Sequence, residues 1–293
     1  MRNGRRRRGL VAVLGALATT AVVAGCAVDE PSGDTRPLPQ PQADASVRQD
    51  EGAIPGETAR AGVSRPDWLG SRVLPERPDG LGEVRDTPPE LVDRRFPPPD
   101  AEPVADGYLA TIAPVPDDVV ARSTWADECP VTLDELRYLM MTFRGFDDRT
   151  YLGEMIVHRS VAEDVVWVFE QLYDARFPIE EMRVVAAGEL DAPPTGDGNN
   201  TTAFVCRPIT LSSSWSEHAY GLAVDINPFH NPYRRDDAVV PELASAYLDR
   251  DRDLPGMIQP GDVVTRAFAD IGWGWGGDWT TLDDWMHFSR SGR

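Results

Sequence analysis

The uneven distribution of proline limits where this chain of 293 residues can build a core. Residues 27–105 contain 14 of the 26 prolines, and their apolar residues follow neither a helical nor an alternating period. Such a segment cannot bury enough apolar surface to offset the entropy that is lost on ordering. We therefore predict a Pro-rich, disordered tether over residues 26–105, in which Trp68-Leu69 and Leu91-Val92 could pack locally, followed by one folded domain over residues 106–293.

The first 26 residues carry a processing signal. Five Arg lie within residues 2–8, a short apolar stretch covers residues 9–20, and Val23-Ala24-Gly25 precedes Cys26. This pattern resembles the bacterial lipoprotein signal, in which small residues precede a Cys that is diacylated and then exposed by cleavage. A transmembrane anchor is the alternative, but a span needs about 20 apolar residues, and a secretory signal with an incidental Cys is another. We predict a signal peptide over residues 1–25 and lipidation at Cys26.

Charge and cysteine content narrow the function classes. The 29 basic residues face 48 acidic ones, which gives a net charge of -19 and argues against a nucleic-acid partner, because binding to phosphates needs a basic surface. Three Cys are too few for a disulfide scaffold or a Cys-rich zinc module. A lipid-anchored protein works outside the cytoplasm, where disulfides form. Cys129 and Cys206 could then form a disulfide, or remain as two buried thiols.

Apolar spacing in residues 106–293 changes between helical and extended patterns. The strongest pattern is a helical stripe over residues 160–176, and Thr132 forms a capping box with Glu135 that predicts a helix continuing through Met140. The same patterns predict two short strands within 144–157, strands over 182–186, 222–226 and 285–289, and a helix over 263–271. Because helices and strands intermix without regular βαβ alternation, we predict an α+β fold.

His218, Asp225 and His287 are the strongest candidates for metal ligands. Asp225 lies in an apolar strand pattern, where an unpaired carboxylate would be costly and a metal ion would compensate its charge. Two His and one carboxylate leave the fourth position on zinc open, as a catalytic site requires. A second carboxylate could then act as general base on the bound water. Asp284 is the candidate for that base, and Asp283 is the alternative.

These residues stand in a pattern shared with a known family. Ser216-x-His218-x-x-Gly221-x-Ala223-x-Asp225, followed by Asp284-x-x-His287, resembles the D-alanyl-D-alanine carboxypeptidase family of zinc peptidases. That family includes the vancomycin-resistance carboxypeptidases and the L-alanyl-D-glutamate endopeptidases. The resemblance extends to residues 199–207, 225–233 and 272–279, and it spans about residues 130–290.

The resemblance implies roles for individual residues. His218, Asp225 and His287 would bind one Zn²⁺, and Asp284 would activate water and shuttle its proton. Arg207 matches the Arg that stabilises the developing oxyanion, a role that suits a guanidinium, and Ser216 would contact substrate or support the ligands. The implied architecture is a small mixed or antiparallel sheet flanked by helices, of the hedgehog/D-Ala-D-Ala peptidase type.

Other polar and aromatic residues near the motifs are interpreted mainly as structural, loop or packing residues. His158 is interpreted as structural or pocket-lining, and His230 as a loop residue. Asp197 lies between two glycines and is either a turn residue or a substrate contact. The three Trp of the Gly-rich segment are more typical of packing around tight turns than of a cofactor site, although one could line a substrate cleft; they are Trp273, Trp275 and Trp279.

Together these observations predict a zinc-dependent peptidase that hydrolyses peptidoglycan stem peptides. Many relatives have Glu at the position of Asp284, and the shorter side chain favours the endopeptidase-like branch over a D,D-carboxypeptidase. We expect a monomer that is anchored to the cell membrane through Cys26 and faces the cell wall, with no nucleic-acid partner. The alternative is a non-catalytic wall-binding lipoprotein that retains the fold, but the presence of both Asp284 and Arg207 favours an enzyme.

Overall fold

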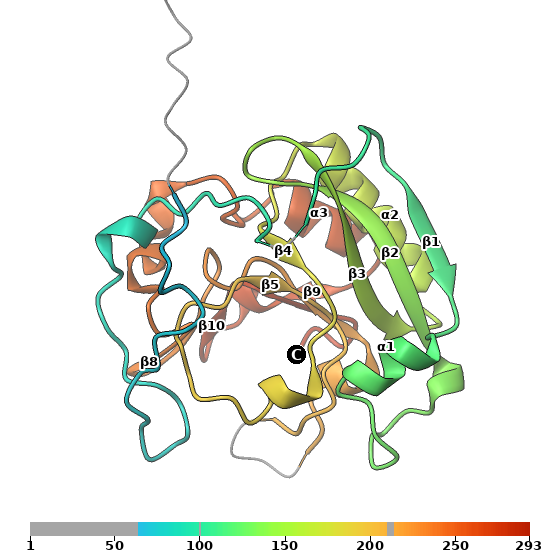
Figure 1. Cartoon of the computed structure of the whole chain (residues 1–293), viewed down its shortest axis with the longest axis horizontal. Coiled ribbons are helices and arrows are strands. Elements are labelled where there is room, and N and C mark those ends of the chain that lie inside the picture. Colours follow the sequence, from blue (N-terminus) through green and yellow to red (C-terminus); the bar gives the residue numbers. More distant parts are fainter. Residues whose placement is uncertain (1–63, 100, 210–213) are drawn as a thin grey trace, which may run out of the picture. The chain divides into compact units, whose positions relative to one another are not determined.

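The computed structural model describes residues 64–99, 101–209 and 214–293, drawn in colour in Figure 1. The strands are β1 (Ala110–Ala113), β2 (Leu136–Arg144), β3 (Thr150–His158), β4 (Glu181–Met182), β5 (Asn200–Thr201), β6 (Ala223–Asp225), β7 (Tyr233–Arg235), β8 (Ala238–Val240), β9 (Gly274–Trp275), β10 (Asp283–Asp284) and β11 (His287–Ser289). The α-helices are α1 (Asp117–Arg122), α2 (Ala162–Asp174) and α3 (Val263–Asp270). The 3-10 helices are η1 (Pro89–Leu91), η2 (Leu133–Glu135), η3 (Ala187–Glu189), η4 (Glu217–Tyr220), η5 (Ser245–Leu248), η6 (Arg250–Arg252) and η7 (Gly276–Asp278).

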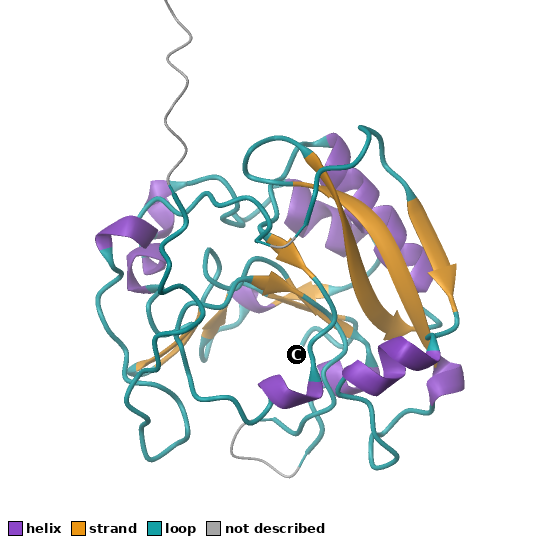
Figure 2. Cartoon of the chain, in the orientation of Figure 1, coloured by secondary structure: helices purple, strands orange, loops and turns teal. Residues whose placement is uncertain are grey.

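The main core lies between helix α2 and an antiparallel sheet of order β1-β2-β3. Helix α2 presents Val165, Val168, Phe169 and Leu172 at helical spacing, and none of these side chains is more than 1% exposed. The helix packs against β2 and against α3 (Figure 2). The predicted helices over 160–176 and 263–271 are therefore confirmed, each with slightly shorter bounds.

The segment after Thr132 differs from its prediction. The capping box is present, because the Glu135 carboxylate accepts a hydrogen bond from the Thr132 N–H, but the helix ends after the single turn η2. Strand β2 follows at once and pairs with β3 over nine residues. Leu139, Met141 and Phe143 alternate along one face of β2 and are all buried. The continuous ladder with β3 thus outweighs the local helical spacing of the leucines.

A second small sheet carries two of the three predicted metal ligands, Asp225 in β6 and His287 in β11. Its order is β6-β11-β9, and both strand pairs are antiparallel. The short parallel pair β4–β5 continues from it, because Thr202, directly after β5, forms a bridge with Asp225 at the end of β6. Small antiparallel sheets with a few helices make this an α+β fold, as predicted.

Residues 64–99, which we call the strap, pack onto the rest of the fold. Leu74, Leu91 and Phe96 are buried in a cluster with Phe229 and Tyr247. In Figure 1 the strap is the blue-to-teal ribbon beside the orange elements of the C-terminal half. The predicted tether over residues 26–105 is therefore too long, because the folded part of the chain begins at least as early as residue 64. Its scattered apolar residues pack against residues far along the chain.

Three predictions concern residues that the structure does not describe. The signal peptide, the lipidated Cys26 and the tether as far as residue 63 all lie outside the described residues. Among the residues that are described, no helix combines the length and the apolar character needed to cross a membrane.

Candidate metal centre

Three predicted ligands converge on one small triangle of donor atoms. His218 Nε2 lies 3.2 Å from Asp225 Oδ1, and His287 Nδ1 lies 3.1 Å from the same oxygen. The two ring nitrogens are 3.2 Å apart. His218 and His287 are buried and Asp225 is half-buried, so bulk water competes little for these atoms.

Strand pairing explains why two of the ligands meet. His287 in β11 is the direct antiparallel partner of Asp225 in β6, so both side chains leave the sheet on the same face. Asp225 is held from its other side by Thr202, because the two residues exchange backbone N–H···O hydrogen bonds of 2.8 and 3.0 Å. Residues far apart in sequence are thereby fixed as neighbours.

The third ligand comes from the short helix η4. His218 Nδ1 lies 2.5 Å from the carbonyl oxygen of Ala203. Because a carbonyl only accepts, Nδ1 carries the proton and the lone pair of Nε2 faces the triangle. Gly221 ends the helix in the left-handed region at φ 65°, where a Cβ would also lie only 2.6 Å from the His158 nitrogen. Any larger residue there would displace the turn that carries His218.

The donor set fits a zinc ion. Edges of 3.1 and 3.2 Å are close to the roughly 3.3 Å between neighbouring ligands on a tetrahedral zinc ion. Burial works to raise the pKa of Asp225, yet the two neighbouring His hold that pKa below its usual range, so the carboxylate is ionised and ready to bind a cation. A set of two His and one carboxylate also leaves an open position on zinc.

Asp284 lies beside the triangle with a free acceptor atom. Its Oδ1 is buried and has no hydrogen-bond partner among the described residues. Burial raises the pKa of Asp284 to about 7, and the nearby Asp225 charge acts in the same direction, while His287 and Arg207 oppose the increase. The backbone of Gly276 approaches Asp284 so closely that a Cβ would lie 2.4 Å from its carbonyl oxygen. That close approach fixes the residue near the ligands.

Asp283, the alternative acid, is used differently. Its Oδ2 accepts hydrogen bonds from Arg234 Nε at 2.9 Å and from Nη2 at 2.5 Å on the neighbouring strand β7. The carboxylate oxygen that accepts both bonds is therefore engaged by the guanidinium. The two adjacent acids of β10 are both half-buried, but Asp283 is paired with Arg234, whereas Asp284 has a buried oxygen without a partner among the described residues.

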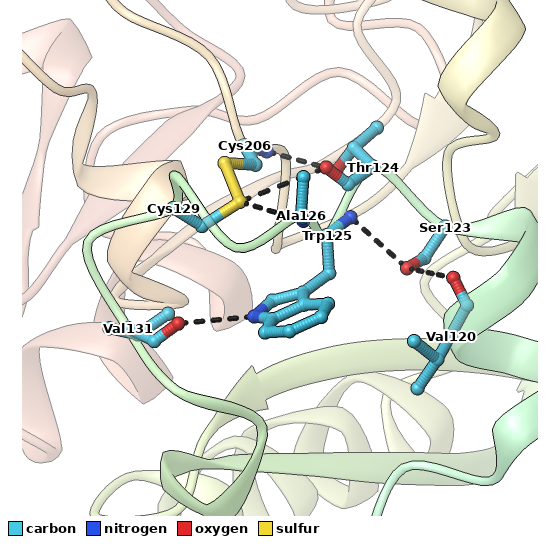
Figure 3. Close-up of a disulfide and its surroundings, with 8 residues drawn as sticks. All are labelled: Val120, Ser123, Thr124, Trp125, Ala126, Cys129, Val131 and Cys206. Carbon is cyan, nitrogen blue, oxygen red and sulfur yellow. Dashed lines mark hydrogen bonds between the residues drawn. A yellow bond between two sulfur atoms is a disulfide. The ribbon is translucent and has the colours of Figure 1, made fainter.

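Arg207 is exposed next to this site and is anchored through its neighbour Cys206. Cys206 and Cys129 form a disulfide, which decides between the two predicted alternatives, and the Cys206 N–H donates to Thr124 Oγ1 at 2.9 Å (Figure 3). Arg207 lies close enough to Asp284 to influence its charge. The exposed guanidinium donates a hydrogen bond from Nη1 to the Pro208 carbonyl oxygen at 3.3 Å. The backbone of Arg207 is held by hydrogen bonds to Val205 and from Ser216.

The comparisons with known proteins agree with this geometry. Residues 210–290 match the family model described as D-alanyl-D-alanine carboxypeptidase. The matched segment contains all three ligands and Asp284. Searches of curated proteins and of solved structures returned no match to the chain.

Two residues predicted to contact substrate have other contacts in the structure. Ser216 is buried, and its Oγ accepts a hydrogen bond from the His218 N–H at 3.3 Å, as an N-cap of η4 does. Asp197 is also buried, and its carboxylate accepts from the Gly70 N–H at 2.8 Å and from Thr195 Oγ1 at 2.6 Å. Of the two alternatives for Asp197, these contacts favour the turn residue, whose carboxylate holds the strap, over the substrate contact.

The remaining His residues lie outside the triangle. His158 is half-buried, and its Nδ1 bonds to Ser160 Oγ at 2.7 Å, in keeping with a structural role. His230 is completely buried, which the sequence interpretation as a loop residue did not predict, and its Nε2 donates to the carbonyl oxygen of Arg94 in the strap at 2.9 Å. The sequence also missed Arg94 itself, because Asp93-Arg94-Arg95 looks like an ordinary run of surface charge.

Proposed function

We propose that this protein is a zinc-dependent peptidase that hydrolyses peptidoglycan stem peptides. The observation that carries the proposal is the triangle of His218, Asp225 and His287, beside which Asp284 has a buried carboxylate oxygen without a partner among the described residues. The match of residues 210–290 to the D-alanyl-D-alanine carboxypeptidase family supports a peptidase. A bound zinc ion would supply Lewis acidity, lowering the pKa of water and polarising a carbonyl.

Two side chains beside the triangle would take part in the reaction. One would transfer a proton from water to the leaving amine, and the other would stabilise the negative charge on the carbonyl oxygen. Asp284, with its pKa raised to about 7, is ionised in a large fraction of molecules at neutral pH and is still basic enough to accept a proton from water. The same oxygen would then donate that proton to the departing amine nitrogen. Arg207 would donate hydrogen bonds to the carbonyl oxygen as negative charge develops there. The result is hydrolysis of an amide bond.

The position of the cut within the stem peptide is the finer part of the proposal. An endopeptidase would cut between L-Ala and D-Glu, whereas a D,D-carboxypeptidase would release the terminal D-Ala. The shorter acid Asp284 favours the endopeptidase-like branch, as in the sequence analysis, and the matched family description favours the carboxypeptidase. The two products differ in mass and are easily told apart.

We also propose that the protein acts outside the cytoplasm, lipid-anchored through Cys26. The N-terminal sequence pattern supports the anchor, and the Cys129–Cys206 disulfide suits an oxidising compartment. We expect radiolabelled palmitate to be incorporated by the wild-type chain and not by Cys26→Ala. A membrane fraction that retains the Cys26→Ala protein would contradict the lipid anchor.

Metal content and product analysis test the main proposal together. Purified protein should bind one equivalent of zinc and release defined muropeptide fragments from isolated peptidoglycan, as measured by mass spectrometry. His218→Ala should lose both zinc binding and product formation, because it removes Nε2, one of the three proposed ligand atoms. One equivalent of zinc with no product from any wall substrate would contradict the enzyme and support the non-catalytic binding protein.

A further inference from the structure

Arg94 in the strap forms a fully satisfied ion pair in the interior. Its side chain and that of Glu180 are each only 1% exposed. Arg94 Nε and Nη2 donate to the two Glu180 carboxylate oxygens at 2.7 and 2.8 Å, and Nη1 donates to the Asp197 carbonyl oxygen at 2.7 Å. A guanidinium supplies this fork of parallel donors, which an ammonium cannot.

The main chain of Arg94 is held as firmly as its side chain. Its N–H donates to the Tyr247 hydroxyl at 2.9 Å, and its carbonyl oxygen accepts from His230 Nε2 at 2.9 Å. The guanidinium also lies 4.5 Å from the centre of the Phe229 ring. The residue is therefore a fixed point on which other groups can be positioned.

Glu180 in turn holds the segment that follows Asp197. Asn199 Nδ2 donates to Glu180 Oε2 at 2.7 Å, and Asn199 Oδ1 accepts from the Phe229 N–H at 2.9 Å. Glu180 directly precedes β4 and Asn199 directly precedes β5, and these two strands pair in parallel. The Arg94–Glu180–Asn199 cluster thus fixes the point at which both strands begin.

Strand β5 leads straight to the support of the metal triangle. Thr202 exchanges two backbone hydrogen bonds with Asp225, and the Ala203 carbonyl oxygen sets the orientation of the His218 ring. Two of the three ligands therefore depend on residues 202 and 203. Their position depends in turn on residues 197–199, which Arg94 and Glu180 anchor.

We propose that Arg94 is a positioning residue for the metal site, acting through Glu180, Asn199 and the segment 199–203. The strap is then a part of the metal centre's support and not only a cover for the hydrophobic cluster around Leu91. This inference rests on the proposed zinc-dependent function. It goes beyond it in assigning a role to a segment that lies outside the family match at residues 210–290.

The test compares two adjacent arginines of the strap in the full chain. Arg94→Gln removes the buried fork, whereas Arg95→Gln removes only an exposed pair with Asp93. Zinc affinity is measured by competition with a chromogenic chelator, and the site geometry by the visible absorption of the cobalt(II) form. We expect Arg94→Gln to raise the zinc Kd about 10-fold and to change the cobalt spectrum, because groups that orient ligands typically act on affinity at this scale, and Arg95→Gln to leave both unchanged.

A purely structural role gives a different result. If Arg94→Gln lowers the melting temperature but keeps the wild-type Kd and cobalt spectrum below that temperature, the proposal is overturned. If Arg94→Gln does not fold, Arg94→Lys takes its place, since it keeps the charge and loses the fork; a wild-type Kd in Arg94→Lys overturns the proposal equally. A wild-type protein that binds no zinc would contradict the proposed function itself, so the two failures are distinguishable.

Discussion

Glu180 is a buried acid and Asp284 is a half-buried acid with one buried carboxylate oxygen, and their surroundings differ in opposite ways. Glu180 accepts hydrogen bonds from Arg94 and Asn199, and although burial works to raise its pKa, the charge of Arg94 holds that pKa below the usual range. Asp284 leaves a buried oxygen without a partner among the described residues, and burial raises its pKa to about 7. The comparison separates an acid whose hydrogen bonds hold the fold together from one whose carboxylate is available for the proposed proton transfer.

The largest expected effect is the loss of hydrolysis when Asp284 becomes an amide. Asp284→Asn cannot accept a proton, so we expect the rate of stem-peptide hydrolysis to fall by about 10²- to 10⁴-fold, with zinc binding retained. The measurement is the initial rate of product formation beside metal content. Asp283→Asn is the matched control, because its carboxylate is paired with Arg234. Equal losses in the two variants would contradict the assignment of Asp284 as the base.

The same change at Glu180 should act on stability instead. Glu180→Gln leaves the buried guanidinium of Arg94 without a charged partner, which we expect to lower the free energy of unfolding by about 3 kcal/mol. Asp284→Asn should change it by less than about 1 kcal/mol, because no hydrogen bond to its free oxygen is lost. Urea unfolding of the metal-free proteins measures both. An equally destabilised Asp284→Asn would remove the distinction between the two acids.

A smaller effect on the free energy of unfolding is expected when His230, which donates a hydrogen bond to the Arg94 carbonyl oxygen of the strap, is titrated. Burial lowers the pKa of His230 to about 4, so between pH 6.5 and 4 the unfolded chain binds a proton that the folded chain does not. Stability should therefore decrease as the pH falls, by about 2 kcal/mol between pH 6.5 and 5 from this group. Glu180, with its lowered pKa, adds a further loss only at lower pH, as the pH falls through its folded pKa.

Urea midpoints at several pH values measure this dependence in the wild type and in His230→Gln. The variant lacks the titrating ring of His230, so its stability should change less steeply with pH over this window, because every other titratable group is common to the two proteins. Parallel curves for the two proteins would show that His230 is not the group responsible.

The candidate metal site was more predictable from the sequence than the strap, to which we assign a supporting role. His218, Asp225, Asp284 and His287 lie in two short stretches, and their residue types have few structural uses in apolar surroundings. The resemblance to the zinc peptidase family, through the spacing Asp284-x-x-His287, favoured Asp284 over Asp283. The bond from His218 to the Ala203 carbonyl could not be predicted, because every residue has a carbonyl and only the fold determines which one faces the ring.

The strap shows where sequence patterns fail. Asp93, Arg94 and Arg95 are indistinguishable as a charged run, yet only Arg94 is buried, because its partners Glu180 and Tyr247 lie 86 and 153 positions further along the chain. Within the described residues 64–99, proline and irregular apolar spacing correctly argued against α-helices and long strands, and only the short 3-10 helix η1 forms there. They did not argue against ordering, since extended segments can be held by side chains of another part of the chain.

The long separation between the strap and its partners also orders events during synthesis. The Thr87 N–H bonds to Ser245 Oγ, 158 positions later, and the carbonyl of Val92 accepts from Arg252, 160 positions later. The strap leaves the ribosome first, but it cannot dock until almost all of the remaining chain exists. Contacts of this sequence separation form slowly, because the entropy of closing a long loop is lost before the contacts stabilise the chain. A truncated or still-growing chain therefore lacks the partners that hold these parts of the strap, and their docking is a late step of folding.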